Sequence, residues 1–208
     1  MVNGTGQRRG IPVIGASAGG VTALQELFAA LPDPLPGVIA AVLHRSPLFE
    51  SVLPMVLGLL TTQRILEPEE EASADRGHIY VAPRDRHLTF ADGHFALTRG
   101  PKQHHTRPAI DPLFRTAAQA YGARVVGVVL TGGGDDGVDG LIAIKHAGGI
   151  SIAQDPDEAP HPWMPRSAIL YDHVDLVLPL LEIAPALVTL AQGGSLGGNS
   201  KRHDVARG

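Results

Sequence analysis

The sequence of 208 residues contains no cysteine, few aromatic residues and no long apolar run. The absence of cysteine excludes disulfides, thiolate catalysis and cysteine-ligated metal sites. Aromatic residues make up 4% of the chain, so alanine, valine and leucine must form most of the core. No apolar run approaches the about 20 residues that cross a bilayer, and the polar N-terminal segment lacks the apolar centre of a signal peptide. These absences predict a cytoplasmic protein without membrane insertion.

Neither sign of charge dominates the chain. Seventeen basic and 21 acidic side chains give a net charge of −4, and both signs are scattered along the sequence. Proteins that bind nucleic acids usually carry a basic face, so nucleic acid is not an expected partner. The length favours one domain that can bury a substantial core.

The two ends of the chain differ in composition from its centre. Residues 1–10 are polar and glycine-rich, and residues 192–208 have the composition of a linker, so we expect both to be disordered. Residues 11–191 are expected to fold as one domain. Within them, strand-like and helix-like segments alternate, which predicts an α/β fold with a mostly parallel sheet and helices on both faces.

Periodicity and turn residues predict the individual elements. The predicted helices follow a 3.6-residue apolar period and cover residues 21–31, 49–60, 111–121, 164–171 and 180–191. One more helix is predicted at the end of a strand-loop-helix unit that covers residues 124–147. Pro54 is expected to kink or shorten the second helix, and Asp111 is expected to cap the third. The predicted strands cover residues 11–14, 38–43, 125–130, 150–153 and 174–178. Residues 78–98 predict a small antiparallel excursion, because Asp92-Gly93 separates short apolar runs.

Three polar residues follow three of the predicted strands. Ser17 lies in the glycine-flanked turn after residues 11–14, His44 follows residues 38–43, and Asp136 lies in a glycine-rich loop after residues 125–130. Open α/β sheets place their chemistry at the carboxyl ends of strands. A histidine can take the proton of a serine hydroxyl, and an aspartate can orient that histidine. The pattern therefore indicates a serine hydrolase.

Each residue of this set also has a structural explanation. The glycine-flanked turn could cradle a phosphate at a helix N-terminus, His44 could be a hydrogen-bonded strand-end residue, and Asp136 or its neighbour Asp135 could cap a helix. A dinucleotide fold is disfavoured, because Ser17 replaces the second glycine of its fingerprint and His44 replaces its acidic residue. An α/β-hydrolase is disfavoured by the chain order serine, histidine, aspartate.

Seven segments in order resemble the catalytic domain of the chemotaxis receptor protein-glutamate methylesterases, the CheB family. They span about residues 11 to 190 and are Ile14–Gly20, His44, Ile79–Pro83, Arg107–Phe114, Val128–Gly137, Ala153–Asp155 and Met164–Ile169. The resemblance implies a doubly wound sheet with a small antiparallel hairpin. It also implies no metal or organic cofactor.

The resemblance assigns roles to residues of this chain. It implies that Ser17 is the nucleophile, His44 the general base and Asp136 the residue that orients it. The oxyanion and substrate loop would contain Ala18, Gly133 and Gly134, and Met164 and Pro165 would border a substrate groove. The implied reaction is hydrolysis of γ-glutamyl methyl esters on the cytoplasmic helices of chemoreceptors, with release of methanol. Deamidation of receptor glutamines is implied as a second activity.

Three features depart from the family pattern. Only ten residues precede the first predicted strand, so we expect no receiver domain in cis and regulation by a separate protein. Ala18 stands where many members have threonine, and Gly133 stands where methionine is common, which predicts weaker activity. Two alternatives stay open: an inactive scaffold that binds receptors or signalling proteins, and a hydrolase of the same fold for another ester. His104, His105 and Arg107 are interpreted as parts of a solvated loop.

Overall fold

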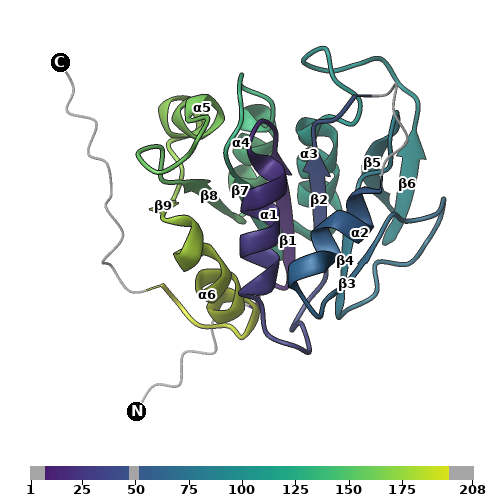
Figure 1. Ribbon diagram of the computed structural model, residues 1–208, viewed down its shortest axis with the longest axis horizontal. Coiled ribbons are helices and arrows are strands. Elements are labelled where there is room, and N and C mark those ends of the chain that lie inside the picture. The colour runs from purple at the N-terminus through teal and green to yellow at the C-terminus, as the bar shows by residue number, and fades with distance from the viewer. Residues whose placement is uncertain (1–7, 47–51, 197–208) are drawn as a thin grey trace.

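The computed structural model describes residues 8–46 and 52–196. Its main sheet is parallel, with seven strands in the order β3-β4-β2-β1-β7-β8-β9 (Figure 1). The strand bounds in chain order are β1 Ile11–Ala16, β2 Ile39–Leu43, β3 Arg64–Leu66, β4 His78–Val81, β7 Val125–Val129, β8 Ile150–Gln154 and β9 Leu176–Leu178. The doubly wound, mostly parallel sheet predicted from the sequence is confirmed.

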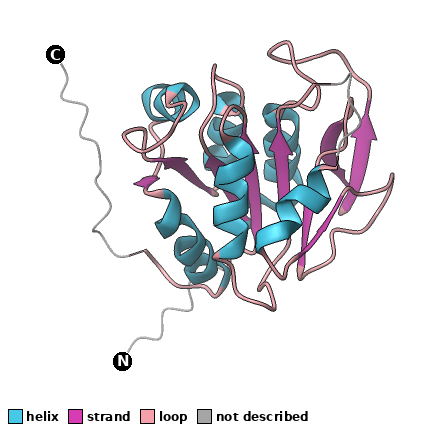
Figure 2. Ribbon diagram, in the orientation of Figure 1, coloured by secondary structure: helices cyan, strands magenta, loops and turns pink. Residues whose placement is uncertain are grey.

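Helices cover both faces of this sheet (Figure 2). One face carries α1 (Gly20–Ala29), α2 (Leu53–Leu57) and α6 (Leu180–Ala191), which share one apolar cluster with the strands. The other face carries α3 (Ile110–Tyr121), α4 (Val138–His146) and α5 (Trp163–Asp172), which share a second cluster. Strands that are buried on both faces read as continuous apolar runs, as β2 and β7 do.

The order of the strands locates the crevice of the sheet. From β1 the chain moves to β2 on one side, and it later returns to β7 on the other side of β1. At such a switch point the loops that follow the neighbouring strands diverge, which leaves a crevice at their carboxyl ends. The loops after β2, β1 and β7 therefore meet at one edge.

The predicted antiparallel hairpin is confirmed: β5 (His87–Ala91) and β6 (His94–Thr98) pair across Asp92-Gly93, with Phe90 opposite Phe95. The first part of the predicted excursion is not antiparallel. β4 belongs to the parallel sheet and pairs with β2. The three-residue edge strand β3 pairs with β4 and was not predicted, because so short a segment carries no periodicity.

Two helix predictions need correction. The described part of the second helix runs only from Leu53 to Leu57 and continues as a 3-10 turn, Gly58–Leu60; residues 49–51 lie outside the described residues. Of the two effects expected of Pro54, the helix shows shortening and no kink: it begins at Leu53, so Pro54 lies in the first turn, where the missing N–H leaves no bond unmade. Helix α3 begins at Ile110, so Asp111 lies in its first turn and is not its cap.

The predicted disorder at both ends falls mostly on residues 1–7 and 197–208, outside the described residues. Of the rest, the Arg9 guanidinium donates to the carbonyl oxygens of Ala123 (2.6 Å) and Gly148 (2.9 Å). Leu196 packs partly against the cluster that contains α6. No helix in the described ranges has the length and apolar character needed to cross a membrane.

Candidate active site

Ser17 lies on the turn between β1 and α1. Its N–H donates to the carbonyl of Thr131 at 3.0 Å, and its own carbonyl accepts from the N–H of Gly20 at 2.8 Å. Gly19 precedes the helix with φ 75°, a left-handed conformation that favours glycine. This turn places Ser17 at the carboxyl end of the central strand.

Close packing around the turn also requires glycine. A Cβ on Gly20 would lie 2.6 Å from Leu43 Cδ1 and 2.8 Å from Ala16 Cβ. Leu43 and Ala16 therefore leave no room for a side chain at position 20. The sequence pattern Gly15 to Gly20 is explained by packing as well as by chemistry.

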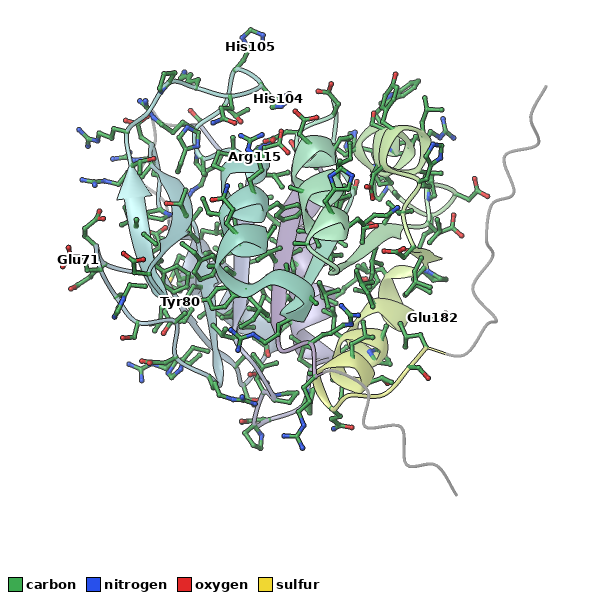
Figure 3. All side chains as sticks on the ribbon, turned by 180° about the vertical axis from the view of Figure 1, so that it is seen from behind. Glu71, Tyr80, His104, His105, Arg115 and Glu182 are labelled. Atoms are coloured by element: carbon green, nitrogen blue, oxygen red, sulfur yellow. The ribbon has the colours of Figure 1, made fainter. Side chains whose placement is uncertain are left out.

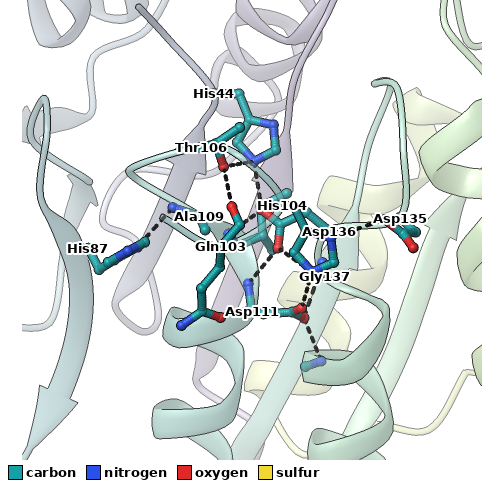
Figure 4. A network of polar contacts seen from close by, with 12 residues as sticks. His44, His87, Gln103, His104, Thr106, Ala109, Asp111, Asp135, Asp136 and Gly137 are labelled. Carbon is teal, nitrogen blue, oxygen red and sulfur yellow. Dashed lines mark hydrogen bonds and ion pairs between the residues drawn. The ribbon is translucent and has the colours of Figure 1, made fainter. Parts of the chain in front are cut away.

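His44 and Asp136 meet across two strand ends. His44 follows β2, Asp136 lies in the loop after β7, and His44 Nε2 lies 2.7 Å from Asp136 Oδ2 (Figure 4). An ionised carboxylate only accepts hydrogen bonds, so Nε2 carries the proton in this pair. In the neutral ring Nδ1 is then the unprotonated nitrogen, and it can act as a base.

Asp136 is held by the start of α3. Its Oδ2 accepts from the N–H of Ile110 at 2.7 Å, and its Oδ1 accepts from the N–H of Asp111 at 3.0 Å. Burial of the Asp136 carboxyl raises its pKa, but the hydrogen bonds from His44, Ile110 and Asp111 outweigh that effect and hold the pKa below its usual range. Asp136 is thus a buried carboxylate whose hydrogen-bond partners all donate to it and stabilise its ionised form.

Asp111 makes the reciprocal contact with α4. Its Oδ1 accepts from the N–H of Gly137 at 3.1 Å and of Gly140 at 2.7 Å, at the start of that helix. Burial, and next the negative charge of Asp136, raise the pKa of Asp111, against the opposing effect of the Gly140 N–H. Asp136, in the loop before α4, therefore satisfies free N–H groups at the start of α3, and Asp111 on α3 satisfies those at the start of α4, which fixes the two helices against each other.

The glycine-rich loop after β7 has both bonded and free N–H groups. The N–H of Gly132 donates to the carbonyl of His161 at 2.8 Å, and Thr131 Oγ1 donates to the carbonyl of Ala18 at 3.1 Å. Within the described residues, the N–H groups of Ala18, Gly133 and Gly134 make no hydrogen bond to the protein. These three, and not Gly132, are available to a ligand.

Ser17 and His44 line one cavity of about 450 Å³. Its other lining residues belong to the glycine-rich loop and to the loop before α3: His104, His105, Thr106, Gly133, Gly134, Asp135 and Asp136. Among the bonds of the described chain, none joins the Ser17 hydroxyl to His44. Hydrogen bonds in unliganded sites are often long and tighten when a substrate binds.

A family model, CheB methylesterase, matches residues 12–187. The chain belongs to the CheB methylesterase family. A crystal structure of the CheB methylesterase catalytic domain of Thermotoga maritima is similar, with a TM-score of 0.83 and 34% identity over 88% of this chain and 99% of that one. The shared fold extends over nearly all of that domain.

Relatives of two lengths match this CheB family member. A protein-glutamate methylesterase/protein-glutamine glutaminase of Pyrococcus abyssi is 40% identical over 194 residues, which are 91% of this chain and 53% of the relative. The chain thus spans about half the length of that relative. A Leptospira interrogans protein is 39% identical over 181 residues, 86% of this chain and 94% of that protein.

The predicted groove residues of this CheB domain lie beneath the surface. Met164 and Pro165 are buried in the first turn of α5, and the N–H of Met164 donates to the carbonyl of Gly132 at 3.0 Å. A Cβ on Gly132 would lie 2.1 Å from Met164 Sδ and 2.8 Å from Ser17 Cβ. Met164 therefore supports the floor of the glycine-rich loop, and a contact with substrate stays a prediction.

Sequence reasoning missed part of this CheB site. His104 was interpreted as solvated, yet its ring bonds to Asp111 and Asp135, each at 3.0 Å. Thr106 Oγ1 lies 3.4 Å from His44 Nε2. Arg107 is also bonded, with Nη2 2.7 Å from Asp85 Oδ1. The available signal was the run of polar residues, including His104, directly before a buried helix start.

One group of the described residues has atoms close enough to hold a metal ion. These atoms, from His104, Asp111 and Asp136, lie within 4.8 Å of one another. Both carboxylates already accept two backbone N–H bonds each, in addition to a histidine. The donor set therefore fits a hydrogen-bonded network better than a cation site.

Proposed function

We propose that this chain is a serine hydrolase that demethylates γ-glutamyl methyl esters on the cytoplasmic helices of chemoreceptors. The 2.7 Å bond between His44 Nε2 and Asp136 Oδ2, in the cavity that Ser17 also lines, is the observation that carries this proposal. Membership of the CheB methylesterase family supports the substrate class. Glutamine deamidation is proposed as a second activity, as the name of the Pyrococcus relative suggests for that protein.

The reaction follows from the roles of the three residues. Ser17 Oγ attacks the ester carbonyl while His44 Nδ1 takes the hydroxyl proton, so a C–O bond forms and the carbonyl oxygen becomes negative. Asp136 stabilises the imidazolium that forms. The imidazolium then gives its proton to the departing methoxide, and methanol leaves an acyl-serine. Water hydrolyses this ester by the same steps and regenerates Ser17 and the receptor glutamate.

The negative oxygen of the intermediate needs hydrogen-bond donors. The free N–H groups of Ala18, Gly133 and Gly134 face no competing acceptor among the described residues, and Ala18 follows the nucleophile directly. Loss of one such donor costs about 10²–10³ in rate in a well-studied protease. A glutamine amide has the same carbonyl, and its attack would release ammonia in place of methanol.

The test is methanol release from methyl-labelled chemoreceptor membranes. We expect release by the native chain, loss of release in Ser17→Ala, and unchanged release in Ser195→Ala, since Ser195 lies after α6 and outside the cavity. Equal release by Ser17→Ala would dismiss Ser17 as nucleophile. No release by the native chain would favour the scaffold or another ester as substrate.

A further inference from the structure

Residues 103–106 form a tight loop, of which His104, His105 and Thr106 line the cavity. Figure 3 shows His104 and His105 at the top of the molecule. Gln103 and Thr106 pair through their backbones, with N to O distances of 3.2 and 2.9 Å. Between them, His104 and His105 both have left-handed backbones, with φ 47° and 62°. Two successive non-glycine residues in this region are strained, so contacts outside the loop must hold it in place.

Two of these contacts are made by His104, and a third joins Arg115 Nη2 to Gln103 Oε1. His104 Nε2 lies 3.0 Å from Asp111 Oδ2 and its Nδ1 lies 3.0 Å from Asp135 Oδ1 (Figure 4). The Asp111 side chain is 1% exposed, whereas that of Asp135 is 63% exposed. Both partners are carboxylates, which accept and do not donate when ionised. A neutral imidazole has one N–H, so only the imidazolium satisfies both partners.

The charges around His104 favour that form. Asp111 and Arg115 face it from α3, with Arg115 Nη1 3.7 Å from Asp111 Oδ2. Asp135 and Asp136 face it from the loop after β7, with Asp136 Oδ1 at 4.0 Å from its Nε2. Burial lowers the pKa of His104, but the negative charges of Asp136, Asp111 and Asp135 outweigh burial and raise the pKa above its ordinary value.

We propose that His104 is a positioning residue that, as an imidazolium, ties the 103–106 loop to Asp111 and Asp135. The tie holds Thr106 beside His44 Nε2, where its hydroxyl accepts part of the same N–H that binds Asp136. A histidine whose folded-state affinity for the proton is raised stabilises the fold at low pH, and that stabilisation is lost as the pH rises through its folded-state pKa. The tie is therefore held below the folded-state pKa of His104, which is raised above its ordinary value, and is lost as the pH rises through that pKa.

The first experiment measures the protonation of His104 as a function of pH, without substrate. We expect nitrogen-detected NMR of the imidazole rings to show His104 titrating above about 6.5, the ordinary histidine value, and to show a lower titration midpoint in Asp135→Asn. The His104→Gln variant identifies its signals. Titration of His104 at or below the ordinary value in the native chain would overturn the proposal.

The effect on the reaction rests on the proposed function and is measured by methanol release. We expect His104→Gln to lower kcat/KM by about fivefold to twentyfold near pH 6.5. It should differ little from the native chain at a pH well above the His104 midpoint that the NMR titration gives, where the native tie is open. His104→Arg, which keeps its charge, should weaken the pH dependence of the native chain.

Lys102→Gln is the matched control, because it removes a positive charge from the residue directly before this loop without breaking the tie. Its kcat/KM should stay within about twofold of the native value. A loss in His104→Gln that is equal at both pH values would overturn the proposal, since it would indicate a structural role only. If the native chain releases no methanol, the proposed function fails while the NMR titration still decides the tie.

Discussion

The two halves of the site differ in how firmly the protein holds them. His44 is bonded to the buried Asp136, and Asp136 also accepts two N–H groups from α3. Ser17, Gly133 and Gly134 line the cavity, and the Ser17 hydroxyl and the N–H groups of Ala18, Gly133 and Gly134 have no hydrogen-bond partner among the described residues. Groups that the fold satisfies are fixed before substrate arrives, whereas unsatisfied groups are available to bind it. The fold therefore fixes the general base before substrate binds, whereas the nucleophile and the N–H donors have no protein partner and can bind the substrate carbonyl.

Asp136→Asn removes the carboxylate that orients His44, and of the changes in this section it has the largest expected effect on kcat/KM. The amide would place N–H donors against the His44 and Ile110 donors, so His44 would lose its orientation. We expect kcat/KM to fall by about 10³–10⁴-fold, as in a serine protease with the equivalent change. Unfolding in urea should show a loss of about 2 kcal/mol.

Asp135→Asn is the matched comparison for that change. Asp135 is the neighbouring residue, its side chain is mostly exposed, and its described side-chain partner is His104. We expect a loss of no more than about fivefold in kcat/KM, because exposed ion pairs contribute little. Similar losses in both variants would mean that the pair of His44 and Asp136 has no special role.

Gly132→Ala and Gly133→Ala compare a tightly packed position of the glycine-rich loop with an open one. A Cβ on Gly132 would collide with Ser17 Cβ and Met164 Sδ, whereas a Cβ on Gly133 would meet nothing within 4 Å. We expect Gly132→Ala to destabilise the fold by about 1–3 kcal/mol. Urea unfolding of Gly132→Ala with the native midpoint would show that the loop floor is not tightly packed.

The pH dependence of stability distinguishes the two aspartates. The folded-state pKa of Asp136 is lowered, so its ionised form stabilises the fold above about pH 4, and this contribution is lost as the pH falls through the folded-state pKa. Asp111 has the opposite shift, and its contribution changes in the opposite direction. We expect urea unfolding between pH 3 and 6 to show a shallower acid decline in Asp136→Asn than in the native chain. An identical decline would contradict the lowered pKa of Asp136.

Gly133→Ala has the smallest expected effect. The position is open and its backbone is not left-handed, so alanine should reduce the freedom of the unfolded chain and raise stability by about 0.4–1 kcal/mol. If the backbone flexibility of Gly133 also makes the loop slow to adopt its reactive conformation, kcat should rise slightly in Gly133→Ala. A fall in both quantities would indicate that Gly133 must move during the reaction.

Sequence reasoning succeeded where a local pattern determines position in space. In a parallel sheet, Ser17, His44 and Asp136 follow neighbouring strands, so their placement at one edge could be predicted from three apolar runs. It did not predict the N–H contacts that Asp136 makes with α3 and Asp111 makes with α4, because the two aspartates lie 25 residues apart in the sequence. The tie of His104 was missed for the same reason, since its partners lie 7 and 31 residues away.

The most direct test of the account is whether the two halves act as one unit. We would measure methanol release by Ser17→Ala, by Asp136→Asn and by the double variant. Residues that act together lose their effect together, so the double variant should be no slower than Ser17→Ala alone. A double variant whose loss equals the product of the two single losses would contradict the account, because Asp136 would then act without Ser17.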